Sequence, residues 1–250
     1  MTPFERGAYR ARLAIGPADL EAAQRLRHLG FIESRGLATE GAQGLDADDL
    51  DALCEHVLIE ETVSGRLVCC YRIMPLSSGA EIDRTYSARH YDLGGLRDYP
   101  APMMEMGRFC VHPDWRRDPN VIRVAWTAMA AYVDARGVEM LFGCSSFMGA
   151  EAEAHMDAFA LLKARHLAPK RWLPRVKAPL TFPFARLLRR KPDLKAAMAK
   201  LPPLLRAYLA MGGWVSDHAV VDRDLNTMHV FTGLEIGRVP KMRARLLRGA

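Results

Sequence analysis

The chain has little cysteine and no long hydrophobic run. Its five cysteines are Cys54, Cys69, Cys70, Cys110 and Cys144, and no two of them form a Cys-x-x-Cys pair. An odd number of scattered thiols is typical of a reducing compartment and favours neither a disulfide framework nor a metal site. No run reaches the roughly 18 apolar residues that a transmembrane helix requires. We therefore expect no disulfide, no bound metal and no membrane span.

The N-terminus also lacks the apolar segment of a secretory signal, because residues 1–20 mix Arg, Glu and Asp throughout.

Acidic residues in turn are almost absent from residues 163–206. That stretch holds 13 Lys or Arg and a single acid, Asp193, for a net charge of +12 in a chain whose total is +6. The other residues therefore carry a net −6. Such asymmetry indicates a polyanionic partner, which could be a membrane surface, nucleic acid or an acidic carrier protein.

Hydrophobic periodicity and turn residues predict alternating helices and strands. Helices are expected over 17–29, 120–136 and 151–165. Two extended runs, 56–61 and 66–74, flank Ser64-Gly65 and predict a hairpin. Residues 81–91 are expected to form a loop or an edge strand. Further strands are expected over 104–112, 138–144, 218–221 and 228–234.

This order predicts an α/β fold in one domain spanning residues 1–250. The strand–helix–strand unit at 104–144 should be parallel, whereas the early hairpin should be antiparallel. The result is a mixed sheet with helices on both faces. A basic amphipathic helical insertion, residues 168–208, should interrupt this core before the last strands.

The expected strand at 104–112 begins a segment that is dense in polar residues and contains a glycine. This segment runs from Glu105-Met106-Gly107-Arg108 to Arg116. Three other motifs stand at fixed places around it: Cys69-Cys70-Tyr71-Arg72, Tyr91-Asp92-Leu93 and Phe142-Gly143-Cys144-Ser145-Ser146-Phe147. In their order and spacing, the sequence resembles the bacterial ornithine lipid N-acyltransferases. These belong to the GNAT superfamily and are related to the acyl-homoserine-lactone synthases. The resemblance covers nearly the whole chain.

The resemblance implies a GNAT fold in which the strands at 104–112 and 138–144 splay apart to admit a thioester arm. It implies that a 3-hydroxyacyl group carried on the phosphopantetheine of acyl carrier protein is transferred to the α-amine of ornithine. The product would be a lyso-ornithine lipid, with no permanently bound cofactor. One feature departs from the superfamily: the glycine-rich pyrophosphate loop is replaced by Trp115-Arg116-Arg117-Asp118-Pro119-Asn120. This departure favours a carrier-protein donor over a CoA-type donor.

Amide formation from a thioester requires a base that accepts the proton of the amine. Glu105 is the candidate base, acting directly or through water, and its alternative is an ion pair with Arg108. Residues 105 and 108 point to opposite sides of a regular strand, so a bulge at Gly107 would be needed to bring them together.

Five residues are candidates for substrate binding. Arg72 could pair with the acceptor carboxylate, or with Asp92 or Glu105 as a structural partner. Arg108 could hold the phosphate of the carrier. The serines that follow the buried strand could donate hydrogen bonds to substrate or cap the next helix. The set is Arg72, Asp92, Arg108, Ser145 and Ser146.

The basic stretch alternates cations with bulky apolar residues. This pattern favours docking on an anionic membrane or on acyl carrier protein, and it is less typical of nucleic-acid binding. A solvated basic face is the simpler alternative. The docking candidates are Phe182, Phe184, Arg186, Arg189, Arg190 and Lys191. We therefore expect a cytoplasmic protein that associates peripherally with the inner membrane.

Two other functions remain open. An acyl-homoserine-lactone-type signal synthase is disfavoured, because such chains look shorter and lack a basic apolar insertion. A non-catalytic, membrane-associated protein on a GNAT scaffold stays possible, because the glycine loop is absent and fold alone does not fix function.

Overall fold

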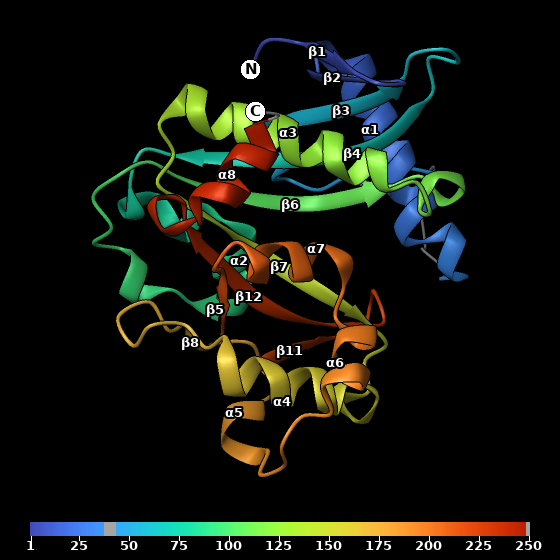
Figure 1. Cartoon of the computed structure of the whole chain (residues 1–250). Helices are drawn as coiled ribbons and strands as arrows, with labels where there is room; N and C mark the ends of the chain where they lie inside the picture. Colours follow the sequence, from blue (N-terminus) through green and yellow to red (C-terminus); the bar gives the residue numbers. More distant parts are fainter. Residues whose placement is uncertain (38–43, 249–250) are drawn as a thin grey trace. The chain divides into compact units, whose positions relative to one another are not determined.

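The chain passes back and forth between two units, seen together in Figure 1. The computed structural model describes residues 1–37 and 44–248. The first unit comprises Met1–Pro75, Met106–Val138 and Lys241–Ala250, and the second comprises Leu76–Glu105 and Glu139–Pro240. Strand β6, Met103–Val111, contributes to both, because the division falls directly after Glu105. The sequence alone predicted one domain over this length.

The strands of the first unit follow the order β1-β2-β3-β4-β6. Each of the pairings β1–β2, β2–β3 and β3–β4 is antiparallel. The predicted hairpin is confirmed as β3–β4, and Gly65 in its turn has a φ of 68°, where only glycine is unstrained. Two short strands at the N-terminus were not predicted. The strands are β1 (Phe4–Arg6), β2 (Tyr9–Leu13), β3 (Glu55–Glu61) and β4 (Leu67–Leu76).

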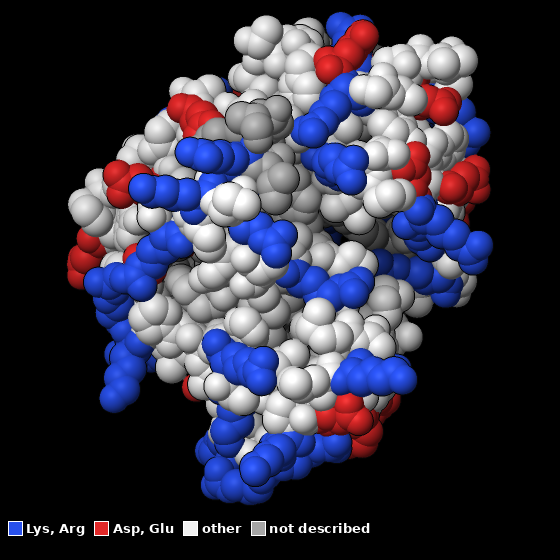
Figure 2. Space-filling view, viewed as in Figure 1, with Lys and Arg blue, Asp and Glu red and all other residues white. Residues whose placement is uncertain are grey.

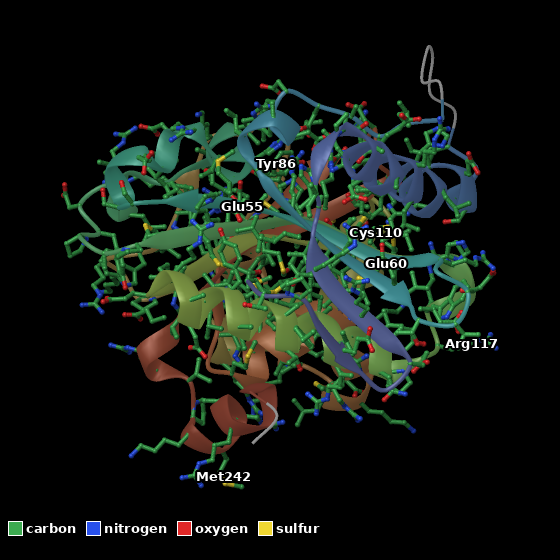
Figure 3. All side chains as sticks on the ribbon, turned by 90° about the horizontal axis from the view of Figure 1, so that it is seen from above. Glu55, Glu60, Tyr86, Cys110, Arg117 and Met242 are labelled. Carbon is green, nitrogen blue, oxygen red and sulfur yellow. The ribbon has the colours of Figure 1, made fainter. Side chains whose placement is uncertain are left out.

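Two helices cover opposite faces of these strands, as Figure 3 shows from above. They are α1, Gly16–Phe31, and α3, Pro119–Arg136. Neighbouring residues of β4 reach different helices: Cys70 packs in a cluster with Leu26 of α1, whereas the Tyr71 hydroxyl donates to the Ala125 carbonyl of α3. Since successive side chains of a strand point to opposite faces, helices on both faces are confirmed.

Local sequence explains the bounds of α3. Asp118 caps its N-terminus by accepting from the Asn120 backbone, and Pro119 occupies the first turn, where a missing N–H costs nothing. Gly137 ends the helix with a φ of 59°. A short helix that was not predicted, α8 (Lys241–Arg248), packs against α3.

The second unit continues from β6 in the order β6-β7-β12-β11-β9, with β10 also paired to β12. The β6–β7 pairing is parallel, as predicted for the strand–helix–strand unit, and the others in this series are antiparallel. A separate pair joins β5 to β8. The strands are β7 (Met140–Met148), β12 (Thr227–Glu235), β11 (Ala219–Asp222), β9 (Thr181–Phe182), β10 (Trp214–Val215), β5 (Tyr91–Asp92) and β8 (Arg175–Val176).

Residues 168–208, where a basic amphipathic helical insertion was expected, form several short elements. They contain β8 and β9, followed by helices α5 (Phe184–Leu187), α6 (Leu194–Lys200) and most of α7 (Pro203–Ala210). Apolar residues of these helices enter the core of the second unit; Phe184 stacks on Phe159 of α4 (Met156–Arg165) at 5.1 Å between ring centroids. Among the residues that the structure describes, no helix has both the length and the apolarity to cross a bilayer.

The segment at 81–91 differs from the expected loop or edge strand. It forms a 3-10 turn over Gly79–Arg84, then helix α2, Tyr86–His90, and only its end joins β5. Thr85 explains the difference, because its side chain accepts from the Ala88 backbone and caps α2.

Two arginines are buried in the first unit among acidic partners. Arg27 and Arg72 are 1% and 3% exposed. Both bond to the Asp51 carboxylate, Arg27 at 2.6 Å and Arg72 at 2.8 Å, while Arg72 also bonds to Asp48 at 2.5 Å. Burial alone would raise the pKa of Asp51, but hydrogen bonds from Arg27 and Gln24 and the arginine charges hold that pKa below its usual range.

Asp51→Asn should therefore destabilise the protein by about 3–5 kcal/mol at pH 7, because it leaves buried arginine charge uncompensated. A carboxyl whose pKa is lowered by folding stabilises above its unfolded pKa of about 4, and that contribution is lost as the pH falls further. The gap between wild type and variant in urea unfolding should therefore narrow below pH 4. Glu21→Gln is the control, since its ion pair with Arg25 is exposed and should contribute less than about 1 kcal/mol. Equal losses of unfolding free energy in Asp51→Asn and Glu21→Gln would contradict this account.

Candidate functional site

Glu105 lies at the end of the parallel pairing between β6 and β7. The recorded register covers three residue pairs and stops at Glu105 opposite Phe142, whereas β7 stays paired with β12 along its whole length. The Glu105 side chain is buried, with 4% of the residue exposed. A charged side chain at such a position needs hydrogen-bond partners, because an unpaired buried carboxylate is very costly.

The first turn of α2 supplies these partners. One Glu105 oxygen accepts from the backbone N–H of Tyr86 at 2.8 Å, and the other accepts from the N–H of Ser87 at 2.7 Å and its hydroxyl at 2.5 Å. Bonds to an ionised acceptor are stronger than neutral ones, and the N-terminal end of a helix favours negative charge. The carboxylate is therefore held in one orientation.

The Cys144 thiol lies beside this arrangement, with its sulfur 3.5 Å from the Ser87 hydroxyl. Burial raises the pKa of Cys144 well above its ordinary value, and the Glu105 charge raises it further. The thiol is therefore neutral at physiological pH. A neutral thiol is a poor nucleophile, so the geometry does not favour covalent catalysis at Cys144.

A group of aromatic and imidazole rings continues along the same face of β7 and β12. Tyr86, labelled in Figure 3, packs its ring 4.7 Å from His90 and 6.5 Å from His229. Tyr91 packs 5.6 Å from the His229 ring and donates a hydrogen bond to the His229 carbonyl oxygen at 2.8 Å. Sequence reasoning missed this group, because its members stand far apart in the chain and a lone His within an apolar strand indicates only a core residue.

The two candidate serines lie on opposite faces of β7. Ser145 is buried and accepts a hydrogen bond from the Thr232 hydroxyl at 2.9 Å. Ser146 is exposed and stands directly across from His229 of β12. Ser146 is therefore the serine that lies on the same face as Cys144.

The candidate arginines belong to the first unit. Arg72 is committed to Asp48 and Asp51, which differ from the two acidic partners that the sequence suggested. Arg108 pairs with Asp48 and Asp46, each at 3.2 Å, and 18% of its side chain is exposed. Arg27 and the three aspartates were not singled out in the sequence, although 46–51 is visibly acidic.

Arg108 has a φ of 52°, in the left-handed region that side-chain-bearing residues rarely adopt. A bulge at Gly107 was the condition for bringing residues 105 and 108 together; the residue with the unusual backbone is Arg108. A β-carbon on Gly107 would lie 3.6 Å from the Arg72 guanidinium, so the glycine lets that side chain pass closely. Backbone strain of this kind persists where surrounding bonds enforce it, which here are the ion pairs of Arg108.

Asp92 has a local role in the structure, because its carboxylate accepts from the Gly94 backbone at 2.9 Å and shapes the turn after β5. Asx-turns of this kind are common after strands.

Phe182 and Phe184, two of the expected docking residues, pack inward. Phe184 is fully buried and Phe182 packs against the same core, so neither projects from the surface. Four apolar side chains nearby are instead about half exposed: Leu180 (46%), Leu187 (51%), Leu194 (46%) and Met198 (46%). The cations around them are exposed as expected: Arg186, Arg189, Arg190, Lys191 and Lys195. Figure 2 shows blue side chains gathered around α5 at the lower end of the view.

Comparisons with known proteins agree with this architecture. A model of the acetyltransferase (GNAT) domain matches residues 26–127. A Rhodobacter capsulatus protein named L-ornithine N(alpha)-acyltransferase is 38% identical over 234 residues, which cover 89% of this chain and 88% of the relative. A protein of the same name from Rhizobium meliloti is 32% identical over 91% of this chain and 80% of its own length.

The crystal structure of the AHL synthase LasI superimposes with a TM-score of 0.50 at 16% identity, over 97% of this chain and 95% of that chain. This likeness concerns the fold, and it confirms the predicted GNAT-like mixed sheet. The sequence identities above go further: the chain belongs to the L-ornithine N(alpha)-acyltransferase family and is an acyltransferase.

Proposed function

We propose that the protein transfers a 3-hydroxyacyl group from acyl carrier protein to the α-amine of ornithine, giving a lyso-ornithine lipid. The shared name of its relatives supports ornithine as the acceptor. The observation that carries the chemistry is the buried Glu105 carboxylate, fixed by α2 where the β6–β7 pairing ends. A positioned carboxylate at this point suits acyl transfer to an amine.

In the proposed reaction, the amine nitrogen attacks the carbonyl carbon of the thioester. The amine proton passes to Glu105, directly or through a water molecule. The new C–N bond remains when the C–S bond breaks, and the pantetheine thiolate leaves on the carrier protein. Glu105 then returns the proton, so that the thiol is released and the carboxylate is restored for the next turnover.

The segment before α3 supports a donor carried on a protein. Its glycine-free sequence forms a 3-10 turn, Pro113–Trp115, followed by Arg116 and Arg117. Arg116 bonds to the Gly30 carbonyl at 3.1 Å and the Ser34 hydroxyl at 2.8 Å. Arg117 is exposed and labelled in Figure 3. An exposed cation near a helix N-terminus can meet the phosphate of phosphopantetheine without a glycine-rich cradle.

Glu105→Gln should lower kcat by about 10²-fold or more, because the amide cannot accept the amine proton. It also places an amide NH2 group, which can only donate, against an N–H donor of α2, so the melting temperature should fall as well. Ser87→Ala is the control, since it removes one donor to Glu105 and keeps the carboxylate. Turnover of ornithine and 3-hydroxyacyl carrier protein should fall far less in Ser87→Ala. If both variants lose rate in proportion to their lost stability, Glu105 only anchors α2.

We further propose that Arg108 binds the carboxylate of ornithine, because it is the more exposed of the two candidate arginines. Arg108→Lys should raise the KM for ornithine by about 10-fold, since lysine cannot form the planar bidentate pair. The KM for the carrier protein should stay near the wild-type value. Arg72→Lys should mainly lower the melting temperature. A rise only in the KM for the carrier would assign Arg108 to the donor phosphate instead.

The basic segment of the second unit is proposed to bind an anionic membrane. Half-exposed Leu187, Leu194 and Met198 stand among cations, and Leu194 and Met198 are four residues apart on one side of α6. Apolar side chains entering the lipid interface, surrounded by cations that meet headgroups, are typical of interfacial helices. The lipid product would then form close to the membrane that receives it.

Reversal of Arg186, Arg189 and Lys191 to glutamate should release the protein from phosphatidylglycerol-containing vesicles, as measured by co-sedimentation. Arg190 is left in place because it pairs with Asp157 at 2.5 Å. Each basic residue near the surface contributes about 1 kcal/mol, and wild-type binding should weaken as salt rises. Turnover of a short-chain donor free in solution should persist.

Reversal of the exposed Arg10, Arg223 and Lys241 is the matched control, because it changes the net charge equally outside this segment. Vesicle binding should survive in that variant. If the basic segment serves the carrier protein, its reversal will leave vesicle binding unchanged and raise the KM for acyl carrier protein.

A further inference from the structure

His229 is a buried polar residue of β12, the third of the nine residues of that strand. Only 1% of it is exposed. Its Nδ1 lies 3.2 Å from the Tyr91 hydroxyl, and the same hydroxyl donates to the His229 carbonyl oxygen at 2.8 Å. Two contacts with one tyrosine fix the orientation of the imidazole ring.

These contacts also determine where the ring proton lies. The Tyr91 hydroxyl has one hydrogen, and the His229 carbonyl accepts it. Nδ1 must therefore carry the ring proton and donate it to the tyrosine oxygen, which leaves Nε2 as an acceptor with a lone pair. Burial, followed by the charges of His90 and His218, lowers the pKa of His229 to about 3, so the ring stays neutral at physiological pH.

Nε2 of His229 has no hydrogen-bond partner among the residues that the structure describes. A buried acceptor without a partner costs about 1–3 kcal/mol, so it needs an explanation. His218 also has a buried unpaired Nε2, but it precedes β11, which lies one strand farther from β7 than β12 does. Of these two histidines, His229 therefore lies on the strand that pairs directly with β7.

The surroundings of His229 connect it to Glu105 within the second unit. Along β7, residues Phe142, Cys144 and Ser146 share the face on which His229 lies, because Ser146 is its cross-strand neighbour. Tyr86 lies between Glu105 and His229: its N–H donates to Glu105 at 2.8 Å, and its ring lies 6.5 Å from the His229 ring. An acyl chain that starts at Glu105 and follows this face would pass the Tyr86 ring and meet the unpaired Nε2 of His229.

We propose that Nε2 of His229 accepts a hydrogen bond from a hydroxyl group on the acyl chain and so selects hydroxylated acyl donors. This inference rests on the proposed acyl-transfer function and names the group that selects its donor. A hydroxyl close to the thioester carbonyl would satisfy the buried acceptor, whereas an unsubstituted chain would leave it unpaired. Sites built to bond a substrate hydroxyl reject the analogue that lacks it far more strongly than apolar sites reject an added group.

The test compares kcat/KM for two acyl carrier proteins of equal chain length, one loaded with a 3-hydroxyacyl group and one with the unsubstituted acyl group. The wild type should prefer the hydroxylated donor by at least about 10-fold, in keeping with one buried hydrogen bond. His229→Phe should abolish most of this preference by losing activity with the hydroxylated donor only. Tyr91→Phe removes the hydroxyl that fixes the ring proton of His229. The donor preference of this variant should lie between that of the wild type and that of His229→Phe.

His155→Phe is the matched control. His155 is also buried with one ring nitrogen unpaired, but it packs against Phe147, which points to the opposite face of β7 from Ser146. Its donor preference should equal that of the wild type. A wild type without preference, or an unchanged ratio in either folded His229→Phe or Tyr91→Phe, would overturn the proposal. No turnover of either donor by the wild type would instead defeat the proposed function itself.

Discussion

Burial of the Glu105 carboxylate is the constraint on which the second unit depends. A carboxylate that is 4% exposed requires donors, and two backbone N–H groups and one hydroxyl of α2 supply them. To do so, α2 must begin at Tyr86, where Thr85 caps it. The position of α2 in turn sets Tyr86 and His90 against the His229 face of the sheet. One buried charge thus positions helix α2 and the rings that it places beside His229.

The first unit handles buried charge in a different way. Three arginines and three aspartates compensate one another there, and Asp51 alone bonds to both Arg27 and Arg72. Such pairs add little net stability compared with apolar packing, but removal of one partner is costly. The cluster therefore fixes the side chains around Arg108 more than it stabilises the fold. This distinction separates Arg72, which is wholly engaged, from Arg108, which remains partly exposed at the edge of the cluster.

Strong local patterns made part of the structure predictable. The 104–144 unit was foreseen because α3 has helical periodicity and a terminating Gly137, and its flanking strands are apolar; the Asp118 cap became visible only in the structure. Glu105 followed from the family resemblance. Helix α2 is only five residues long and depends on Glu105, which lies 18 residues from Ser87, so periodicity could not reveal it. The docking residues of the basic stretch were predicted less well for a related reason. Alternation of cations and apolar residues identifies amphipathic character but does not show which apolar residues enter the core, as Phe184 does.

The local irregularities lie near residues to which the proposals assign functions. Arg108 adopts a left-handed backbone conformation three residues after Glu105 in the chain, and His229 buries an unpaired acceptor on the face that α2 covers. A sequence optimised only for stability would have neither irregularity. Glycine at position 108 would relieve the backbone strain, and an apolar residue at position 229 would need no hydrogen-bond partner. Sequences tend to break local rules where binding or catalysis requires it. A carboxylate held rigidly by one helix and an imidazole held by one tyrosine are arrangements that trade stability for fixed geometry. Acyl transfer depends on such geometry, because amine, carbonyl carbon and base must be aligned before the proton moves.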